Sequence, residues 1–252
     1  TAITGASGGG TQTMLLAAID DRIERLRASL SRSGCAEPLL VEAFALIRHA
    51  SERTLGRRPY DTQLIAARVM FDKRVAEMAT GEGKTLAAAV CAAAGALAGV
   101  PVHVITVNDY LVERDADLMR PLYAALGLTV GHIAAKHDLV TRKQAYACDI
   151  TYCTARDLVF DYLRDRTVRN PLLSEAQRRA AELDAPGRAA PTLLRGLCMA
   201  VVDEADSILL DEARIPLILS TSSPDTARAS FHALALDFAR RLVIGRNCAV
   251  DP

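Results

Sequence analysis

The sequence contains no tryptophan, and aromatic residues together make up only 4% of it. Stacking on exposed nucleobases generally relies on aromatic side chains, so this scarcity argues against a dedicated nucleic-acid-binding module. Net charge is lacking too, because 30 Lys and Arg residues balance 30 Asp and Glu residues. Without an overall positive field there is little to attract a phosphate backbone. No nucleic-acid partner is expected.

The sequence also lacks C-x-x-C pairs, although it has six cysteines. Such usage is ordinary for a chain in a reducing cytosol and does not suggest a disulfide framework. No basic segment followed by an apolar one opens the chain, so no export signal is recognised. The 22 residues 86–107 carry no Lys, Arg, Asp or Glu. Their many alanines and the Gly99–Pro101 turn favour a buried helix, a turn and a buried strand over a membrane span, and we expect a soluble protein.

Apolar residues, in contrast, make up 50% of the 252 residues, enough for a sizeable core. Helical spacing of apolar residues predicts two helices near the N-terminus, one with a stripe from Leu15 to Leu30 and one from Pro38 to Gly56. The expected domains are a flexible Gly/Ser/Thr-rich N-terminus at 1–13, N-terminal helices at 14–58, a nucleotide-binding domain at 59–221, and a C-terminal helix or the start of a further domain at 222–252.

From Tyr60 onward, short apolar runs alternate with helical patterns, which is typical of an α/β fold with a parallel sheet and helices on both faces. The stretch 167–196 interrupts this alternation and is expected to be a surface excursion, and 221–226 a linker before a last helix at 227–242. The predicted strands are 75–78, 102–107, 129–133, 150–154 and 199–203, and the predicted helices between them are 84–98, 109–126 and 139–147.

The segment Thr80-Gly81-Glu82-Gly83-Lys84-Thr85 follows a short apolar run and precedes a helical pattern, the context that a phosphate-binding loop requires. Gly81 and Gly83 allow the backbone around Glu82 to curl so that its N–H groups point at phosphate oxygens. Lys84 would supply charge for the β- and γ-phosphates, and Thr85 a hydroxyl for Mg²⁺. Met78 stands where the general motif has its first glycine. The alternative is a glycine-rich turn that only caps a helix.

A second motif is the apolar run Ala200-Val201-Val202 followed by Asp203 and Glu204. At the carboxyl end of a parallel strand, these carboxylates would face the same crevice as the phosphate loop. Asp203 can hold Mg²⁺, and Glu204 can orient and deprotonate the water that attacks a γ-phosphate. An acidic strand end is by itself more often a solvated turn. Together with the phosphate loop, it indicates nucleotide hydrolysis.

Two further groups of polar residues deserve an interpretation. Gln63, in Tyr60-Asp61-Thr62-Gln63, has an amide that can both donate to and accept from an adenine edge, although a glutamine at a helix start is usually surface. The other group consists of His132, His137, Cys148 and Cys153. It lacks the tight paired spacing of a structural zinc site, so we interpret these as unrelated core and loop residues.

Four long blocks contain these motifs: PYDTQLIAARVMFDKRVAEMATGEGKTLAAAV (59–90), HVITVNDYLVERDADLMRPLYAALGLTVG (103–131), DITYCTARDLVFDYLRDR (149–166) and VVDEADSILLDEARIPLILS (201–220). In content and order they resemble the SecA family of preprotein-translocase motor ATPases. The resemblance covers about 60–220 and extends more loosely to the two preceding helices.

This resemblance implies a RecA-like first nucleotide-binding domain that uses ATP, with ADP as product, and Mg²⁺. It also implies work on unfolded preproteins at the SecY channel, and a cytoplasmic location that is peripheral to the inner face of the bacterial plasma membrane. By motif, Gln63 matches the adenine-reading glutamine and Gly81 to Thr85 match the phosphate loop. Lys84, Asp203 and Glu204 match the catalytic groups, with Thr85 and Asp203 at the metal.

The chain departs from the family pattern at several positions. Ala79 stands where the family usually has arginine, Cys153 replaces a glycine, and Ala155-Arg156-Asp157 replaces Asn-Asn-Glu. The resemblance to further family segments stops at Pro252, which we expect to mean either a fragment or a shortened paralogue. Two other functions stay open: a DEAD-box nucleic-acid helicase, because residues 203–206 spell Asp-Glu-Ala-Asp, and a non-hydrolysing nucleotide-binding adaptor.

Overall fold

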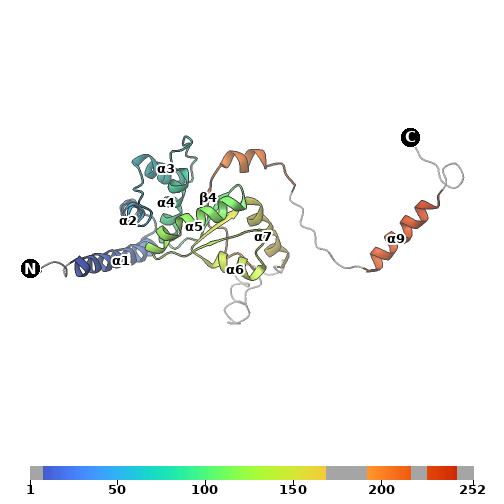
Figure 1. The fold of residues 1–252 in the computed structure, drawn as a ribbon, viewed down its shortest axis with the longest axis horizontal. Coiled ribbons are helices and arrows are strands. Elements are labelled where there is room, and N and C mark those ends of the chain that lie inside the picture. Colours follow the sequence, from blue (N-terminus) through green and yellow to red (C-terminus); the bar gives the residue numbers. More distant parts are fainter. Residues whose placement is uncertain (1–7, 169–191, 217–225, 243–252) are drawn as a thin grey trace, which may run out of the picture. The chain divides into compact units, whose positions relative to one another are not determined.

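The structure is a computed structural model that describes residues 8–168, 192–216 and 226–242 (Figure 1). It divides into one unit at Thr1–Leu217 and another at Ile218–Pro252. The second unit contains helix α9 (Thr226–Arg240), within two residues of the helix predicted there. Most of the excursion expected at 167–196, and nearly all of the linker expected at 221–226, lie outside the described residues.

Two helices precede the sheet, as the apolar spacing predicts. Helix α1 (Gly8–Ser33) begins inside the segment for which a flexible N-terminus was expected, and α2 (Glu37–Leu55) ends at Gly56, which adopts a φ of 64°. Of the stripe predicted on α1, Ile23, Leu26 and Leu30 are buried, and the earlier members lie outside the side chains that the structure describes. These residues pack into the same core as α2, so the helices brace the sheet domain.

The sheet has four parallel strands in the order β2-β3-β1-β4. Helices alternate with these strands, which confirms the predicted α/β fold (Figure 1). Observed and predicted bounds of the four strands agree to within one residue at each end. The elements of this part of the chain are α3 (Asp61–Phe71), α4 (Lys84–Leu97), β1 (Val102–Thr106), α5 (Asp109–Ala125), β2 (Val130–His132), α6 (Leu139–Ala147), β3 (Ile150–Thr154), α7 (Ala155–Val168), β4 (Met199–Val202) and the short π-helix η1 (Ser207–Asp211).

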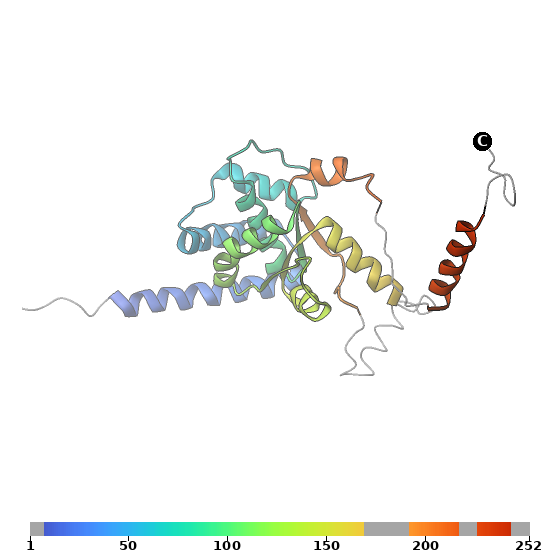
Figure 2. The same ribbon diagram turned by 45° about the vertical axis from the view of Figure 1, so that its right-hand side comes forward.

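Helices cover both faces of the sheet (Figure 2). Alternate strand residues such as Val104 and Tyr152 join a core with α1, α2, α4 and α5. Their neighbours Ile105 and Cys153 join a second core with α6 and α7. Side chains of successive strand residues point to opposite faces, so strands this apolar must be covered on both sides. The carboxyl ends of β1 and β4 then meet at one edge, where the candidate site lies.

The uncharged segment 86–107 forms most of α4, a turn and β1. The side chains of α4 from Leu86 to Leu97 are buried in the domain core. In the described part of the chain, no helix combines the length and the apolar character needed to cross a bilayer.

One predicted strand is wrong. Residues 75–78 form no strand, and Val75 is 87% exposed. The physical reason is the lack of a partner: β4 pairs with β1 on one side, and within the described residues no strand pairs with its other side. Four residues that include Glu77 bury too little to form an edge strand by themselves. The predicted phosphate loop is therefore reached from α3 through a segment that lies outside the sheet.

Candidate nucleotide-binding site

The predicted phosphate loop lies between α3 and α4 and turns back on itself. Gly81 and Gly83 have φ angles of 89° and 80°, in the left-handed region where a side chain is strained. The Glu82 carboxylate accepts a hydrogen bond from the Ala79 backbone N–H at 3.0 Å, which closes the turn. Helix α4 begins at Lys84, directly after the loop. Unpaired N–H groups at such a helix start favour an anion.

Gln63 lies in the first turn of α3 and contacts the phosphate loop. Its Oε1 accepts a hydrogen bond from the Tyr60 N–H at 2.9 Å, and its Nε2 donates to the Glu82 carbonyl at 2.7 Å. Only 5% of the residue is exposed. These two bonds fix which end of the amide donates, and each end retains capacity for one further hydrogen bond. The glutamine is therefore held, as a selective base-reading group must be.

Asp203 follows β4 and extends its pairing, because its backbone N–H donates to the Ile105 carbonyl at 2.9 Å. The residue is half-buried. Burial raises the pKa of its carboxyl above the ordinary value, and the charge of Asp115 acts in the same direction. The cations of Lys84 and Arg114 act in the opposite direction. Lys84 and Asp203 are thus electrostatic neighbours, although they are far apart in the sequence.

Glu204 is exposed and has a φ of 54°, one of two positive values among the described non-glycine residues. A glutamate in the left-handed region costs on the order of 1–2 kcal/mol. Its backbone N–H donates to the Asp203 carboxylate at 3.0 Å. Strained residues of this kind are concentrated at functional sites, where the strain fixes the direction of a side chain.

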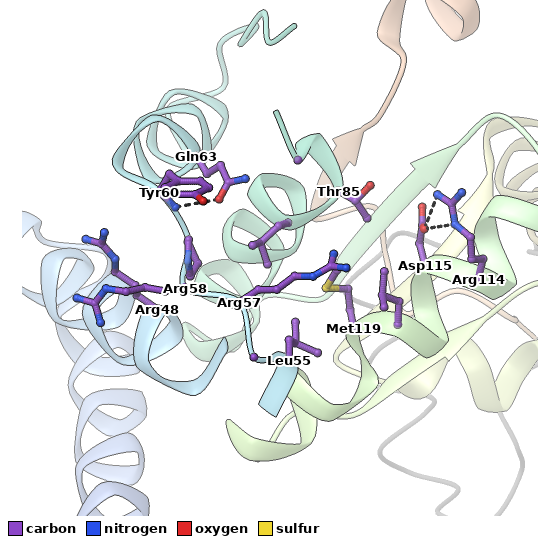
Figure 3. Close-up of a pocket in the computed structure, with 15 residues that line it drawn as sticks. Arg48, Leu55, Arg57, Arg58, Tyr60, Gln63, Thr85, Arg114, Asp115 and Met119 are labelled. Atoms are coloured by element: carbon purple, nitrogen blue, oxygen red, sulfur yellow. Dashed lines mark hydrogen bonds and ion pairs between the residues drawn. The ribbon is translucent and has the colours of Figure 1, made fainter. Parts of the chain in front are cut away.

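A cavity of about 670 Å³ lies beside these groups (Figure 3). Gln63, Gly83 and Thr85 line it, together with residues from the end of α2 and from α5. Gly81, Glu82, Lys84, Asp203 and Glu204 are not among its lining residues. The structure therefore brings three of the predicted site residues into one cavity, and places the Asp203 carboxylate, at the end of β4, within the field of Lys84.

Several cavity residues were missed from the sequence. Arg57 and Arg58 precede Tyr60, and Arg114 and Asp115 lie on α5. Arg114 donates to the Asp115 carboxylate at 2.8 Å, and Asp115 is 2% exposed. The sequence contained only an indirect indication of two of them. Arg114 lies in the block 103–131, which resembles the family, and Arg57 is six residues before the predicted site residue Gln63. Neither position stands out by residue type alone.

The four residues considered as metal ligands do not come together as a set. The rings of His132 and His137 lie 5.1 Å apart between centroids, and the His137 Nδ1 accepts from the Ala134 N–H at 3.2 Å. Cys153 is buried in the second core. Within the part of the chain that the structure describes, no three His, Cys, Asp or Glu residues are grouped to hold a metal ion.

Comparison with known proteins gives a consistent result. The family described as "SecA DEAD-like domain" matches residues 7–244. A protein of Nitrosospira multiformis named "Protein translocase subunit SecA 2" is 49% identical over 232 residues, which cover 92% of this chain and 34% of that protein. A protein of Cellvibrio japonicus named "Protein translocase subunit SecA" is 46% identical over 209 residues, which cover 83% of this chain and 21% of that protein. The chain thus spans about a third or less of the length of these relatives.

Proposed function

The chain belongs to the SecA DEAD-like domain family, and on this basis we propose that it binds ATP and ADP as the nucleotide-binding part of a protein-translocating ATPase. One observation carries the proposal. The start of α4, with Gly83 and Thr85, shares a cavity with a fixed glutamine amide, while Lys84 acts electrostatically on the carboxylate at the end of β4. A base reader, a phosphate loop and an acidic strand end are the parts that such chemistry needs.

The roles of the residues follow from their positions. Gln63 accepts from the adenine amino group with Oε1 and donates to a ring nitrogen with Nε2, using the capacity that Tyr60 and Glu82 leave free. Guanine offers a carbonyl in place of that amino group, so a fixed amide rejects it. The N–H groups of Gly81 and Gly83 and the Lys84 ammonium hold the phosphates. Glu204 takes the proton from the attacking water.

The acidic strand end also fits a divalent cation. Burial raises the pKa of the Asp203 carboxyl despite the cations of Lys84 and Arg114, so a further positive charge beside it would favour the ionised form. Asp203 and the Thr85 hydroxyl are hard oxygen donors of the kind that Mg²⁺ prefers. When bound, Mg²⁺ supplies positive charge to the phosphates. The pairing of β4 with β1 fixes the direction from which Asp203 would meet it.

The wider activity is proposed from the relatives. Two of them are named as protein translocase subunits. Together with the sequence resemblance, these names support our proposal that the work coupled to hydrolysis is the transport of unfolded preproteins through a SecY-type channel. We propose accordingly that the protein works in the cytoplasm, in peripheral contact with the inner face of the plasma membrane. Turnover by this 252-residue chain alone is expected to be slow, because an arginine from a second lobe or protein often supplies about 10³–10⁵ in rate.

Lys84→Ala and Glu204→Gln test this proposal. We expect Lys84→Ala to abolish ADP and ATP binding in titration calorimetry, because it removes charge from the bound phosphates. Glu204→Gln should keep the binding and lose single-turnover hydrolysis, because it removes only the base. Lys136→Ala removes an exposed lysine that pairs weakly with Glu113 at 3.9 Å, and should change neither. Equal loss of ATP affinity in Lys84→Ala and Glu204→Gln would contradict the separate roles.

A further inference from the structure

One carboxylate in the wall of the cavity has no role in the proposed nucleotide site. Asp115 lies in the second turn of α5 and is only 2% exposed, yet it lines the cavity together with Thr85. Both contacts from Arg114 reach the same carboxylate oxygen, Oδ1, at 2.8 Å from Nε and 2.7 Å from Nη2. Among the residues that the structure describes, no donor is found for the other oxygen, Oδ2. Half of this carboxylate is therefore not used by the protein itself.

Asp115 lies at the end of the cavity where the predicted metal ligands are. Helices α4 and α5 pack into the same core on one face of the sheet. Figure 3 shows the Asp115 carboxylate on the same flank of the cavity as Thr85, with Gln63 on the opposite flank. Burial is the largest cause of the raised pKa of the Asp203 carboxyl, and the charge of Asp115 adds to it. Three oxygen donors, Thr85, Asp115 and Asp203, therefore lie at the end away from the base-reading glutamine.

A buried tyrosine on β3 supports this placement. Burial raises the pKa of the Tyr152 hydroxyl, and the hydrogen bond of 2.8 Å to the Tyr123 hydroxyl acts against it. The charges of Asp115 and Asp203 both act in the same direction as burial. One hydroxyl thus lies within the fields of both carboxylates, although Asp115 is on α5 and Asp203 follows β4.

The charges at this end of the cavity fit a cation. Lys84 and Arg114 supply two positive charges, whereas Asp115, Asp203 and Glu204 supply three negative ones. The phosphates of a bound nucleotide would add further negative charge. A carboxylate repels a phosphate oxygen but is a preferred ligand of Mg²⁺, and buried charges in proteins are generally paired or coordinate a metal. A free carboxylate oxygen beside a phosphate loop therefore points to a divalent cation.

We propose that Asp115 is a third group of the metal site, whose carboxylate holds the hydrated Mg²⁺ together with Thr85 and Asp203. This inference rests on the proposed nucleotide site and adds to it a residue from α5. Mg²⁺ usually keeps several waters and takes one or two carboxylates in sites that it shares with substrate phosphates. Loss of a group that supports a metal site costs about 10- to 100-fold in metal affinity.

The experiment measures two affinities for the parent chain and for Asp115→Asn: that of Mn²⁺ for the ADP complex, by electron paramagnetic resonance, and that of ADP in EDTA, by calorimetry. Mn²⁺ replaces Mg²⁺ because it suits the same oxygen ligands. We expect Asp115→Asn to weaken Mn²⁺ binding by about 10- to 100-fold. ADP affinity in EDTA should be unchanged or tighter, because the variant removes a negative charge from the phosphate end. Asp117→Asn, which removes an exposed carboxylate two residues along α5, is the matched control and should change neither affinity.

Arg114→Gln separates metal binding from a merely structural role. It removes the cation beside Asp115 but keeps an amide that can donate to Oδ1. The Asp115 carboxylate then lacks its compensating charge, so Mn²⁺ affinity should be equal to that of the parent or higher. If Asp115 served only to orient Arg114, both variants would instead lose the same binding. Urea midpoints show whether each variant folds, and Arg114→Gln alone tests the proposal if Asp115→Asn does not.

Other results would overturn the assignment. Unchanged Mn²⁺ affinity in Asp115→Asn, or lowered Mn²⁺ affinity in Arg114→Gln, would show that Asp115 does not hold the cation. Loss of ADP affinity in EDTA in Asp115→Asn would assign the carboxylate to a donor on the nucleotide, such as a ribose hydroxyl. A parent complex that binds Mn²⁺ no more tightly than free ADP does would refute the metal site alone. A parent chain that binds no ADP would refute the nucleotide site itself, and the assignment with it.

Discussion

Replacement of Gly83 by alanine tests the link between the phosphate loop and α3. Gly83 has a φ of 80°, and a Cβ atom built on it would collide with the Gln63 Nε2 and lie 3.5 Å from the Gln63 Cδ. Gly81 provides a matched comparison. Its φ is 89°, and a Cβ atom there would have no neighbour within 4 Å. Both substitutions strain the backbone, but only Gly83→Ala displaces Gln63.

The magnitudes follow from these two contributions. An alanine in the left-handed region costs about 1–2 kcal/mol, and the reduced freedom of the unfolded chain affects both variants alike. Displacing Gln63 breaks its bonds to Glu82 and Tyr60, each worth about 0.5–1.5 kcal/mol. We therefore expect Gly81→Ala to lower the free energy of unfolding by about 1–2 kcal/mol, and Gly83→Ala by about 2–5 kcal/mol.

Urea unfolding of four proteins measures the collision directly: the parent, Gly83→Ala, Gln63→Ala and the double variant. With Gln63 already shortened, Gly83→Ala should cost only the backbone strain, the same as Gly81→Ala in the parent. The coupling energy between the two sites should be about 1–3 kcal/mol. If Gly83→Ala and Gly81→Ala destabilise equally, or if Gln63→Ala gives no relief, Gln63 does not support the loop in the way that the contacts indicate.

Two further predictions concern buried polar groups far from the loop. Asp161 is fully buried, and its carboxylate accepts a hydrogen bond from Arg142 at 2.8 Å. Asp161→Asn should therefore lower the free energy of unfolding, measured in urea, by about 3–5 kcal/mol. The control Asp117→Asn, in an exposed ion pair with Arg120, should change it by under about 1 kcal/mol. A similar effect of both variants would contradict this. Burial lowers the pKa of His103 below 6.5, so the folded state binds fewer protons than the unfolded chain. The free energy of unfolding should therefore fall as the pH drops through 6.5 and level off below the lowered pKa. In urea titrations above and below pH 6.5, His103→Gln should lose less stability than the parent between the two pH values.

Periodicity and composition predicted most of the sheet domain. The helix predicted at 139–147 and the strand at 150–154 have the observed bounds, because each apolar pattern there coincides with the face that is buried. Helix starts were also readable, since Asn108 and Asp138 cap α5 and α6 by accepting backbone N–H groups. In these elements, the local preferences of the chain agree with its tertiary packing.

The sequence does not show which strands and which charged side chains pair in the fold. The segment 75–78 has a strand-like composition, but whether it pairs depends on a neighbour that composition does not describe. The pairing of the cavity arginines was hidden for a related reason, because the sequence does not show which acidic groups fold beside them. Only the positions of Asp61, Glu52 and Asp115 in the structure show that Arg48, Arg58 and Arg114 are engaged.

The missing strand also changes which group holds the phosphate loop. A loop that follows a paired strand is fixed by the sheet, but here residues 75–78 belong to no strand and Val75 is 87% exposed. The bond from the Gln63 Nε2 to the Glu82 carbonyl then becomes the hydrogen bond that connects the tip of the loop to α3. The same amide is the group proposed to read adenine. A base bound in the correct orientation would immobilise Gln63 further, and through Glu82 it would order the loop that receives the phosphates. A guanine nucleotide that forced the amide to rotate would break this bond and loosen the loop, so discrimination between bases would extend to the phosphates as well.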